Sequence, residues 1–331
     1  MPMNKQWLLA SRPRGAPSVD NFRLVESPVP AIGPGEVLVR NHYMSLDPYM
    51  RMRMDDAKSY AAPQPLDEVM QGGTVGEVVA SNNPAFAIGD KVVGRLGWQL
   101  FARSDGTGLG KVDATRVPLS AYLGAVGMPG VTAWWGVNGI IEPKAGETVV
   151  VSAASGAVGA VAGQLAKFRG CRVVGVAGGP RKCEAVVEEF GFDACVDYKA
   201  GNLAGDLAAA TPEGIDGYFE NVGGAVLDAV LARVNAFARI AVCGLIASYS
   251  GAPIPVNNFR SVLVNRLKIQ GFIISEHPDI WPKALAELGE LVAGGRIRYR
   301  ETVAQGIESA PEAFIGLLQG RNFGKQLVKL V

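Results

Sequence analysis

Residues 148–168 read TVVVSAASGAVGAVAGQLAKF and carry the strongest indication of a fold in this chain. The run Thr148–Ser152 is apolar and rich in valine, which is typical of a strand covered on both faces of a sheet. The apolar spacing of residues 157–168 indicates a helix. The turn between them contains Gly156 and Gly159 in the pattern A-x-G-x-x-G. The stretch therefore predicts a strand, a tight turn and a helix in direct succession.

A turn of this kind can hold the pyrophosphate of a dinucleotide. We expect Gly156 to let the backbone approach the phosphates and Gly159 to let the helix pack closely on the sheet. The first helical N–H groups, near Ala157 and Val158, would then face the phosphate charge. The pattern lacks the first glycine of the usual fingerprint, so a tight turn that binds nothing is the alternative interpretation. The strand–turn–helix context favours dinucleotide binding.

The same alternation continues along the chain. Strands are predicted at Arg172–Ala177, Ala194–Asp197, Ile215–Glu220 and Arg239–Cys243, with helical stretches such as Arg181–Glu189 between them. Strands that alternate with helices at this interval form parallel βαβ units. We therefore expect an α/β fold with a doubly wound parallel sheet over residues 125–290.

The flanking segments are organised differently. Short apolar or alternating runs recur at residues 6–10, 22–28, 36–43, 73–80, 91–95 and 111–117, which suggests a compact antiparallel barrel or sandwich. Near the end, Ser309–Glu312 has the pattern of a capping box that opens a helix through Leu318. Lys325–Val331 is predicted to be a final strand. We interpret residues 291–331 as a βαβ-like piece that completes the domain of residues 1–124.

Composition excludes several classes of protein. Hydrophobic residues make up 48% of the 331 residues and charged residues 19%, so a sizeable core can form. The net charge is +1 without a block of like charge, so we expect no nucleic-acid partner. No run of about 18 apolar residues occurs, so we expect no membrane span. The four cysteines form no C-x-x-C pair, which favours a cytoplasmic protein with reduced thiols.

The end of the second strand indicates which dinucleotide would bind. An enzyme that uses NAD usually has Asp or Glu here, to hold the ribose 2′-hydroxyl. This chain instead reads AGGPRK over residues 177–182, with no carboxylate and two cations. Arg181 or Lys182 would attract a 2′-phosphate, although both could simply be solvated residues of the next helix. Because cations at a helix start oppose the macrodipole, we favour a bound anion and hence NADP(H).

The residues that hold a catalytic zinc in many two-domain dehydrogenases are missing. The chain has two histidines, His42 and His277, and no cysteine before Cys171, so the first domain cannot hold a four-cysteine site. A pairing of His42 with Asp47 lacks a third soft ligand; we interpret His42 as a strand residue and expect no metal. The G-x-S-x-G elbow of a hydrolase is also absent from the sequence. Cys183 follows a lysine and is either a reactive thiol or an ordinary helix residue.

Several motifs occur together in the order found in one family. They are DPYMR at 47–51, GMPGVTA at 127–133, the glycine turn, DYK at 197–199, FENVGG at 219–224 and CGLIASY at 243–249. Over essentially its whole length the chain resembles the zinc-independent medium-chain dehydrogenase/reductases, in the leukotriene/prostaglandin reductase branch that includes bacterial curcumin reductase-like NADP-dependent oxidoreductases. The resemblance implies a GroES-like β-barrel catalytic domain, a Rossmann NADP-binding domain and a homodimer. It also implies reduction of the carbon–carbon double bond of α,β-unsaturated ketones or aldehydes.

The resemblance also implies a set of site residues. Those expected to bind the cofactor are Gly156, Ala157, Val158, Gly159, Lys182, Tyr198, Asn221, Cys243, Gly244, Tyr249, Phe272 and Asn322. Tyr60 and Tyr249 match tyrosines that face the substrate in this branch. The chain departs from mammalian relatives over residues 272–277, which leaves the preferred enone undefined.

The expected chemistry requires a hydrogen-bond donor. Hydride addition to the β-carbon of an enone leaves negative charge on the carbonyl oxygen, and a donor aimed at that oxygen lowers the barrier. A tyrosine hydroxyl keeps its proton at neutral pH, so we expect Tyr249 to be this catalytic donor, with Tyr60 as a second candidate. Alternatively, Tyr249 only lines the pocket. A quinone reductase, a zinc-free carbonyl reductase and an NADP-binding protein without turnover are the other functions left open.

Overall fold

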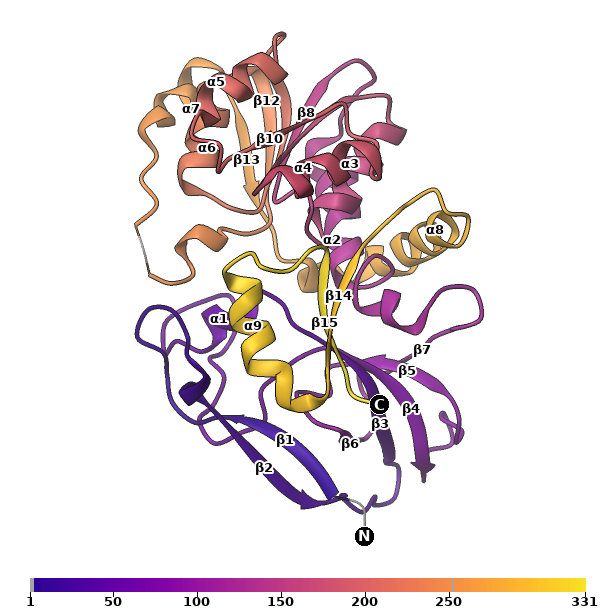
Figure 1. The fold of residues 1–331 in the computed structure, drawn as a ribbon. Helices are drawn as coiled ribbons and strands as arrows, with labels where there is room; N and C mark the ends of the chain where they lie inside the picture. Colours follow the sequence, from indigo (N-terminus) through magenta and orange to yellow (C-terminus); the bar gives the residue numbers. More distant parts are fainter. Residues whose placement is uncertain (1–2, 252) are drawn as a thin grey trace. The chain divides into compact units, whose positions relative to one another are not determined.

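The computed structural model describes residues 3–251 and 253–331 and divides the chain into two compact units (Figure 1). One comprises the chain up to Leu123 together with Glu301–Val331, and the other is Gly124–Arg300. The second unit thus includes residues 291–300, which the sequence pattern assigned to the first domain. The backbone of Arg298 explains this difference, because its N–H and C=O both bond to the Gln164 side chain at 2.8 Å. Among the described residues no helix has both the length and the apolarity to cross a membrane.

The unit Gly124–Arg300 is built on a parallel sheet of six strands in the order β10-β9-β8-β11-β12-β13. The strands are β8 (Thr148–Ser152), β9 (Arg172–Ala177), β10 (Ala194–Asp197), β11 (Ile215–Glu220), β12 (Val234–Val242) and β13 (Lys268–Gly271). The chain order reverses between β8 and β11, which is where doubly wound sheets bind ligands. The bounds of β8 to β11 agree with the predicted ones, because glycine-containing turns flank each of these strands in the sequence.

Helices accompany these strands. They are α2 (Met128–Trp135), α3 (Gly159–Phe168), α4 (Pro180–Glu188), α5 (Leu203–Ala210), α6 (Gly224–Leu231), α7 (Arg260–Val264) and α8 (Trp281–Ala293), with a π-helical turn at Gly136–Ile141. Two predicted starts differ from the observed ones by more than one residue. Helix α3 begins at Gly159 and not at residue 157, because the preceding residues form the turn. Strand β12 begins at Val234 and not at Arg239; it bulges at Phe237, whose φ is 64°, and this irregularity interrupts the sequence pattern.

A buried apolar cluster joins this sheet to helices α5 and α6. Its strand members include Val150, Val174 and Tyr218, and its helix members include Leu207 and Val230. All five side chains are at most 1% exposed in the described structure. Burial of apolar area stabilises a fold by about 25 cal/mol per Å², so this cluster anchors the strands whose ends carry the candidate site.

The other unit contains a mainly antiparallel sheet centred on β3, which pairs with β15, β4 and β6. Its elements are β1 (Met3–Leu9), β2 (Phe22–Pro28), β3 (Val37–Ser45), α1 (Tyr49–Arg53), β4 (Thr74–Ser81), β5 (Lys91–Gly94), β6 (Phe101–Ser104), β7 (Gly110–Lys111), β14 (Glu301–Gln305), α9 (Ala310–Leu318) and β15 (Lys325–Lys329). The strand predicted at 111–117 was mostly wrong. Thr115 donates its backbone N–H to the Asp113 carboxylate at 2.9 Å, which turns the chain after β7.

The C-terminal segment forms the βαβ piece that the sequence indicates. Strands β14 and β15 are parallel, and β15 pairs antiparallel with β3. The capping box predicted at Ser309 was wrong. A short 3₁₀ turn runs directly into α9, so the Ser309 backbone is already helical, and its hydroxyl donates to the Gly306 carbonyl at 2.7 Å.

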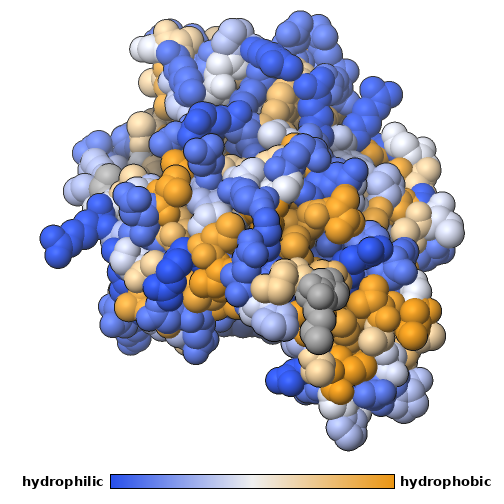
Figure 2. All heavy atoms as spheres, turned by 60° about the horizontal axis from the view of Figure 1, so that its bottom comes forward, coloured by the Kyte–Doolittle hydropathy of each residue, from blue (hydrophilic) through white to orange (hydrophobic). Residues whose placement is uncertain are grey.

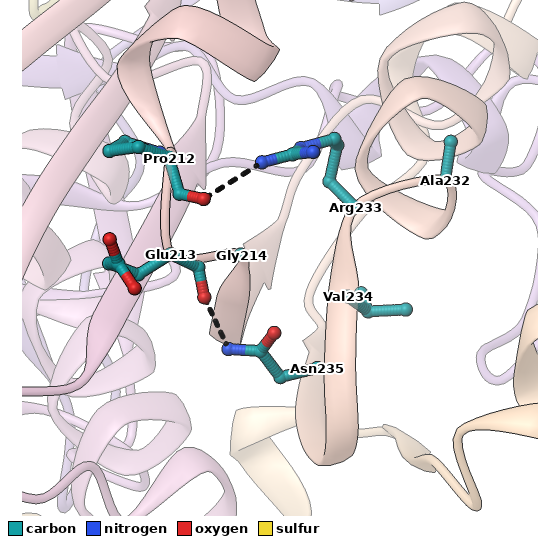
Figure 3. A pocket seen from close by; sticks show the side chains of 7 residues that line it. All are labelled: Pro212, Glu213, Gly214, Ala232, Arg233, Val234 and Asn235. Carbon is teal, nitrogen blue, oxygen red and sulfur yellow. Dashed lines mark hydrogen bonds between the residues drawn. The ribbon is translucent and has the colours of Figure 1, made fainter.

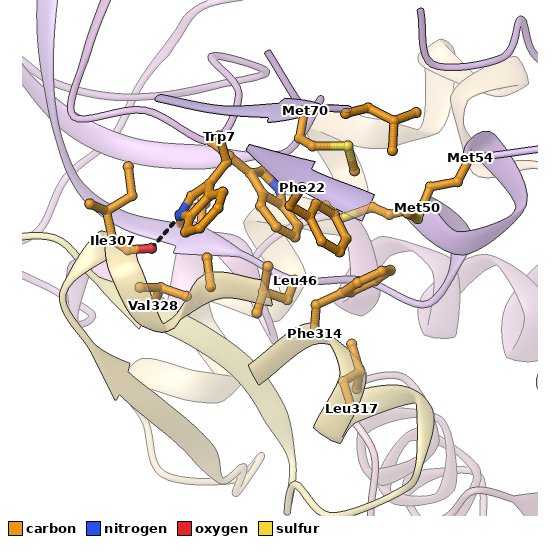
Figure 4. Close-up of a cluster of buried hydrophobic side chains, with 14 residues drawn as sticks. Trp7, Phe22, Leu46, Met50, Met54, Met70, Ile307, Phe314, Leu317 and Val328 are labelled. Atoms are coloured by element: carbon orange, nitrogen blue, oxygen red, sulfur yellow. Dashed lines mark hydrogen bonds between the residues drawn. The ribbon is translucent and has the colours of Figure 1, made fainter. Parts of the chain in front are cut away.

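The core of this unit joins its N-terminal strands to the C-terminal segment (Figure 4). The Trp98 ring lies 5.6 Å, between ring centroids, from both Phe22 and Phe314. The Trp7 indole donates to the Ile307 carbonyl at 2.7 Å. Aromatic packing of this kind adds about 0.5–1.5 kcal/mol per pair beyond area burial, so residues 301–331 are an integral part of the unit.

The molecular surface is not uniformly polar. On the face shown in Figure 2, hydrophobic residues gather in patches between hydrophilic ones. Large side chains exposed in the described structure include Leu263 (80%), Ile88 (70%) and Phe259 (64%). Two of these belong to the same region, α7 and the turn before it, and clustered exposed apolar residues mark candidate contact surfaces.

Candidate active site

The glycine turn lies at the carboxyl end of β8, on the edge of the sheet where all six parallel strands end. Residues that follow parallel strands share one edge, because the strands point the same way. The predicted cofactor residues of this unit follow those ends: Gly156, Ala157, Val158 and Gly159 after β8, Lys182 after β9, Tyr198 after β10, Asn221 after β11, Cys243, Gly244 and Tyr249 after β12, and Phe272 after β13. The fold therefore gathers them at the edge where doubly wound sheets bind dinucleotides.

Backbone geometry in the glycine turn explains its small residues. Ala153 has a φ of 48°, in the left-handed region that favours glycine. Its carbonyl accepts the Gly156 N–H at 2.8 Å and would lie 2.4 Å from a Cβ on Gly159. Only glycine fits at position 159, because a side chain there would collide with the Ala153 carbonyl, which belongs to the same turn directly after β8. The sequence interpretation had attributed this glycine to packing of the helix on the sheet.

A buried carboxylate organises the loop after β11, and sequence reasoning missed it. Glu220 is fully buried, and its Oε1 accepts hydrogen bonds from the Ser152 hydroxyl at 2.9 Å, the Val222 N–H at 2.5 Å and the Gly223 N–H at 3.0 Å. Burial raises the pKa of Glu220 above its usual range. A carboxylate that ends an apolar strand within the FENVGG motif was the signal that could have identified it.

The same network positions Asn221. Its backbone N–H donates to the Ser152 hydroxyl and its side-chain amide donates to the Ser152 carbonyl, both at 2.8 Å. Asn221 is thereby fixed between the ends of β8 and β11, beside the glycine turn. Glu220, Ser152 and Asn221 form a rigid support for whatever ligand meets this edge.

Two cations and a tyrosine surround the end of β9. Lys182 is half-buried, and burial first and the charge of Lys199 second lower its pKa. The Lys199 ammonium lies 5.8 Å from the centroid of the Tyr198 ring. The Tyr198 ring in turn fills the space beside Gly178, where a Cβ would lie 2.9 Å from its hydroxyl. Arg181, the other candidate cation, is exposed, whereas Lys182 is half-buried, so this arrangement favours Lys182. Lys199 is also exposed, but it lies beside the Tyr198 ring and its charge acts on Lys182.

An acidic residue is present nearby, but the backbone engages it. One carboxylate oxygen of Asp197 accepts the Gly179 N–H at 2.7 Å and the Lys199 N–H at 2.9 Å. Asp197 therefore ties the turn after β9 to the turn after β10. It holds the basic subsite in place and does not occupy the position of the ribose-binding acid of NAD enzymes.

Tyr249 belongs to the turn after β12. Its hydroxyl oxygen accepts the Leu245 N–H at 3.3 Å and would lie 3.1 Å from a Cβ on Gly244. The same Cβ would lie 3.6 Å from the Asn221 carbonyl, so Tyr249 and Asn221 meet on either side of Gly244. The backbone N–H of Cys243 donates to the Glu220 carbonyl at 2.9 Å, which links this turn to the buried network.

The Phe272 ring is packed inside the protein and does not face a ligand site. Its side chain is 8% exposed and packs edge-on against Phe219, with 6.4 Å between the ring centroids. Its backbone N–H donates to the Val242 carbonyl at 3.3 Å. Phe272 thus fixes the start of the segment after β13, and we expect its backbone and not its ring to be available to a ligand.

Two predicted site residues, Tyr60 and Asn322, belong to the other unit. Tyr60 lies between α1 and β4 and is 45% exposed. The Asn322 amide donates to the Gly324 carbonyl at 2.8 Å, just before β15. Their roles therefore stay predictions.

The pairing of His42 with Asp47 does not occur. His42 lies on β3 with its Nε2 3.7 Å from the Glu77 carboxylate, and burial lowers its pKa. The Asp47 carboxylate instead meets the Lys325 ammonium at 2.5 Å and the Ser45 hydroxyl. Both residues serve the structure of their own unit.

A hollow lies at the opposite edge of the parallel sheet (Figure 3). It measures about 340 Å³ and lies where β11 and β12 begin. Its polar groups bond one another: Asn235 donates to the Glu213 carbonyl at 3.0 Å and to Asp216 at 2.8 Å. It is remote from the carboxyl ends of the strands and is not the candidate active site.

Comparison with known families agrees with this architecture. Residues 5–112 match a family described as the N-terminal domain of oxidoreductase, and residues 157–290 match one described as zinc-binding dehydrogenase. Within residues 3–251 and 253–331, no group of three or more His, Cys, Asp or Glu side chains could hold a metal ion. The side chains present therefore do not fit the zinc that the second description names.

Individual relatives cover almost the entire chain. NADPH-dependent curcumin reductase of Escherichia coli is 49% identical over 99% of this chain and 97% of its own. Prostaglandin reductase 1 of Rattus norvegicus is 42% identical over 98% of each chain. The crystal structure of CurA in complex with NADPH from Vibrio vulnificus is 47% identical over 99% of each chain, with a TM-score of 0.95. The chain belongs to the medium-chain dehydrogenase/reductases, in the branch that contains curcumin reductase and prostaglandin reductase.

Proposed function

We propose that this protein uses NADPH to reduce the carbon–carbon double bond of α,β-unsaturated ketones or aldehydes. The observation that carries the choice of cofactor is the basic subsite formed by Lys182 after β9 and by Tyr198 and Lys199 after β10. An NAD enzyme has an acid at the end of the strand that corresponds to β9. The names of the relatives support the substrate class, since they include a curcumin reductase and a 2-alkenal reductase.

The chain's own residues would divide the work of binding. The Gly156 N–H is bonded to the Ala153 carbonyl, so the N–H groups that follow it, at the start of α3, would face the pyrophosphate. The subsite of Lys182 and Lys199 would take the 2′-phosphate. Asn221, held by Ser152, faces the nicotinamide half, with Gly244 giving the backbone room to approach. When bound, NADPH supplies the hydride that reduces the substrate.

The reacting substrate needs a donor at its carbonyl oxygen, where charge develops. We assign this role to the Tyr249 hydroxyl, which stands in the turn after β12 beside Asn221 and Gly244. A tyrosine hydroxyl keeps its proton at neutral pH. The Leu245 N–H fixes the oxygen of this hydroxyl, so its position is set before substrate arrives, which is the condition for transition-state stabilisation. Tyr60 as a substrate-facing residue and Asn322 as a cofactor-binding residue are further proposals that rest on the family resemblance.

The decisive experiment follows NADPH absorbance with a linear enone, a quinone and a saturated ketone, and identifies each product. We expect rapid oxidation with the enone and a saturated ketone as product. Turnover of the quinone alone would indicate a quinone reductase, and an allylic alcohol from the enone would indicate a carbonyl reductase. If NADPH bound tightly but was oxidised with none of the acceptors, an enzymatic role would be contradicted.

The donor is tested with Tyr249→Phe. We expect kcat to fall about 10²-fold or more with little change in the Kd for NADPH, since loss of one such donor costs about 2.7–4 kcal/mol of barrier. Tyr60→Phe tests the second candidate. Tyr122→Phe is the matched control, because the Tyr122 hydroxyl only donates to the Asp113 carbonyl at 2.8 Å. An unchanged kcat in Tyr249→Phe would assign Tyr249 to the pocket lining.

We also propose that two copies associate through the β13 edge of the parallel sheet. Among the residues that the structure describes, β13 pairs with β12 alone, and its other edge is open. Ile269 on β13 is 40% exposed, and Leu263 and Val264 on the neighbouring α7 are 80% and 52% exposed. An open strand edge flanked by apolar side chains is suited to pairing with a second copy.

Light scattering tests this association. The double variant Leu263→Glu/Ile269→Lys is expected to be monomeric, and Ile88→Glu, at a 70% exposed apolar residue of the other unit, is expected to keep the native mass. A monomeric native protein would refute the proposal.

We also propose a cytoplasmic location, supported by four free cysteines, which fractionation of cells can test.

A further inference from the structure

Two cysteines face one another behind the basic subsite. Cys183 lies in the first turn of α4 and Cys195 lies on β10, twelve residues later, with their sulfur atoms 2.7 Å apart. Both side chains are partly accessible, and both cysteines are free. A disulfide bond is about 2.05 Å long, so the two sulfur atoms need to approach by only about 0.7 Å to form one.

We propose that peroxide oxidises the thiols of Cys183 and Cys195, which then form a reversible disulfide between α4 and β10. The bond would join the helix turn that carries Lys182 to the strand that leads into Tyr198. It would therefore lie directly behind the subsite proposed for the 2′-phosphate, and this coupling rests on the proposed use of NADPH. The dithiol itself does not depend on that use.

The four cysteines differ in their readiness to react. Desolvation raises the pKa of Cys171 to about 11 and that of Cys243 to about 12, so both stay as unreactive thiols. The Cys195 thiol donates a hydrogen bond to the Cys183 sulfur, which lowers the pKa of Cys183 and raises that of Cys195. Cys183 is therefore the attacking sulfur and Cys195 the resolving one, because the thiolate is the reactive form.

Hydrogen peroxide or an organic hydroperoxide is the oxidant. The Cys183 thiolate attacks one peroxide oxygen; an S–O bond forms, the O–O bond breaks, and hydroxide or alkoxide leaves. The Cys195 sulfur then attacks the sulfur of the resulting sulfenic acid, the S–S bond forms, the S–O bond breaks, and hydroxide leaves to be protonated. With hydrogen peroxide, two thiols and one peroxide yield one disulfide and two waters, a transfer of two electrons.

A bound 2′-phosphate should oppose this oxidation. Lys182 adjoins Cys183 in the first turn of α4, and closing the disulfide would draw that turn toward Cys195 on β10. An anion bound at Lys182 would hold the turn in its place and so resist this movement. Because such coupling is reciprocal in equilibrium, we expect the oxidised protein to bind the phosphorylated dinucleotide more weakly, by at least threefold, while its affinity for the unphosphorylated one changes less.

The first experiment treats the full-length protein with hydrogen peroxide and measures intact mass and the number of thiols under denaturing conditions. We expect a loss of two hydrogens, a fall from four titratable thiols to two, a Cys183–Cys195 linked peptide, and full reversal by dithiothreitol. Cys171→Ser/Cys243→Ser should oxidise in the same way. Cys195→Ser should instead accumulate a sulfenic acid on Cys183. If Cys183→Ser/Cys195→Ser lost two thiols as fast as the native protein, the proposal would be overturned.

The second experiment repeats the oxidation with saturating NADP⁺ or NAD⁺, which supply no reducing equivalents. We expect NADP⁺ to slow disulfide formation at least threefold and NAD⁺ to slow it less. Equal effects of the two, with NADP⁺ bound more tightly, would overturn the coupling. A protein that prefers NADP⁺ but forms no disulfide would refute the dithiol and leave the proposed function standing. Disulfide formation without any preference for NADP⁺ would refute the proposed cofactor and leave the dithiol standing.

Discussion

Asp47 and Lys325 lie 278 residues apart in the sequence and form a buried ion pair, with 2.5 Å between Nζ and Oδ1. Their side chains are 8% and 4% exposed. The same ammonium donates to the Leu46 carbonyl at 2.8 Å. These two interactions of Lys325 connect β15 to the segment that follows β3. The DPYMR motif, which helped to identify the family, begins with a residue whose task in this chain is structural.

Removal of one partner of this pair should destabilise the protein strongly. Lys325→Met leaves the Asp47 carboxylate buried without its cation, and breaking a buried pair in this way costs about 3–5 kcal/mol. Urea unfolding followed by circular dichroism measures the change. Lys5→Met is the matched control, because the ion pair of Lys5 with Glu308 is exposed and its loss should have little effect. Equal midpoints for the two variants would contradict the buried pair.

The left-handed backbone of Ala153 predicts a stabilising substitution. An alanine pays about 1–2 kcal/mol for this conformation, whereas glycine loses about 0.4–1 kcal/mol through the greater entropy of its unfolded chain. Ala153→Gly should therefore raise the free energy of unfolding by up to about 1 kcal/mol. Ala154→Gly is the control: Ala154 is fully buried, and its methyl group packs at the position beside Gly175, so this variant should lose about 1–2 kcal/mol.

The two adjacent cations before Cys183 should differ in their effect on cofactor choice. Lys182→Ala should weaken NADPH binding roughly ten- to hundredfold, because a charge-assisted hydrogen bond contributes about 1.5–3 kcal/mol. NADH binding should change little. Arg181→Ala, at the exposed neighbour, should leave the preference intact, and Lys199→Ala should lower it by an intermediate factor. Isothermal titration with both dinucleotides measures the ratio; equal losses in Lys182→Ala would contradict the subsite.

Glu220 should make stability depend on pH in an identifiable way. Its pKa is raised in the fold by burial, so the native state binds the proton more tightly than the unfolded chain does. Binding of this proton therefore adds to the free energy of unfolding. The full contribution is present below the unfolded pKa of about 4.5, and it is lost as the pH rises through the raised pKa of the folded state. Glu220→Gln stays neutral at every pH and retains an oxygen for the Val222 and Gly223 N–H groups.

Denaturant unfolding of both proteins between pH 4.5 and 8 isolates this effect. Other carboxylates, such as Asp193 and Asp228, have lowered pKa values and lose stability as pH falls, but they are common to both proteins and cancel in the difference. We expect the native protein to become less stable than Glu220→Gln as pH rises. Parallel curves over this range would show that Glu220 is ionised at the same pH in the folded and unfolded states.

Local pattern was sufficient for the frame of the Gly124–Arg300 unit. Strands β8, β9, β10 and β11 were predicted with their observed bounds, because glycine-containing turns flank each of them in the sequence. The glycine turn and the family motifs are short and contiguous, so they could be recognised without any knowledge of contacts. The family and the α/β fold followed from them and were confirmed.

Contacts between distant residues were decided only in the tertiary structure. The prediction of a capping box at Ser309 was wrong because the preceding turn continues directly into the helix. The four residues of the pattern do not indicate that continuation. The bonds of Glu220 with Ser152, of Cys195 with Cys183 and of Asp47 with Lys325 join separate elements. A carboxylate or thiol in the sequence carries no record of its partner, because burial and partner distance set its pKa and its energy only once the sheet has formed. The sequence alone therefore determined which backbone frame forms, and packing determined which side chains of that frame are charged, paired or reactive.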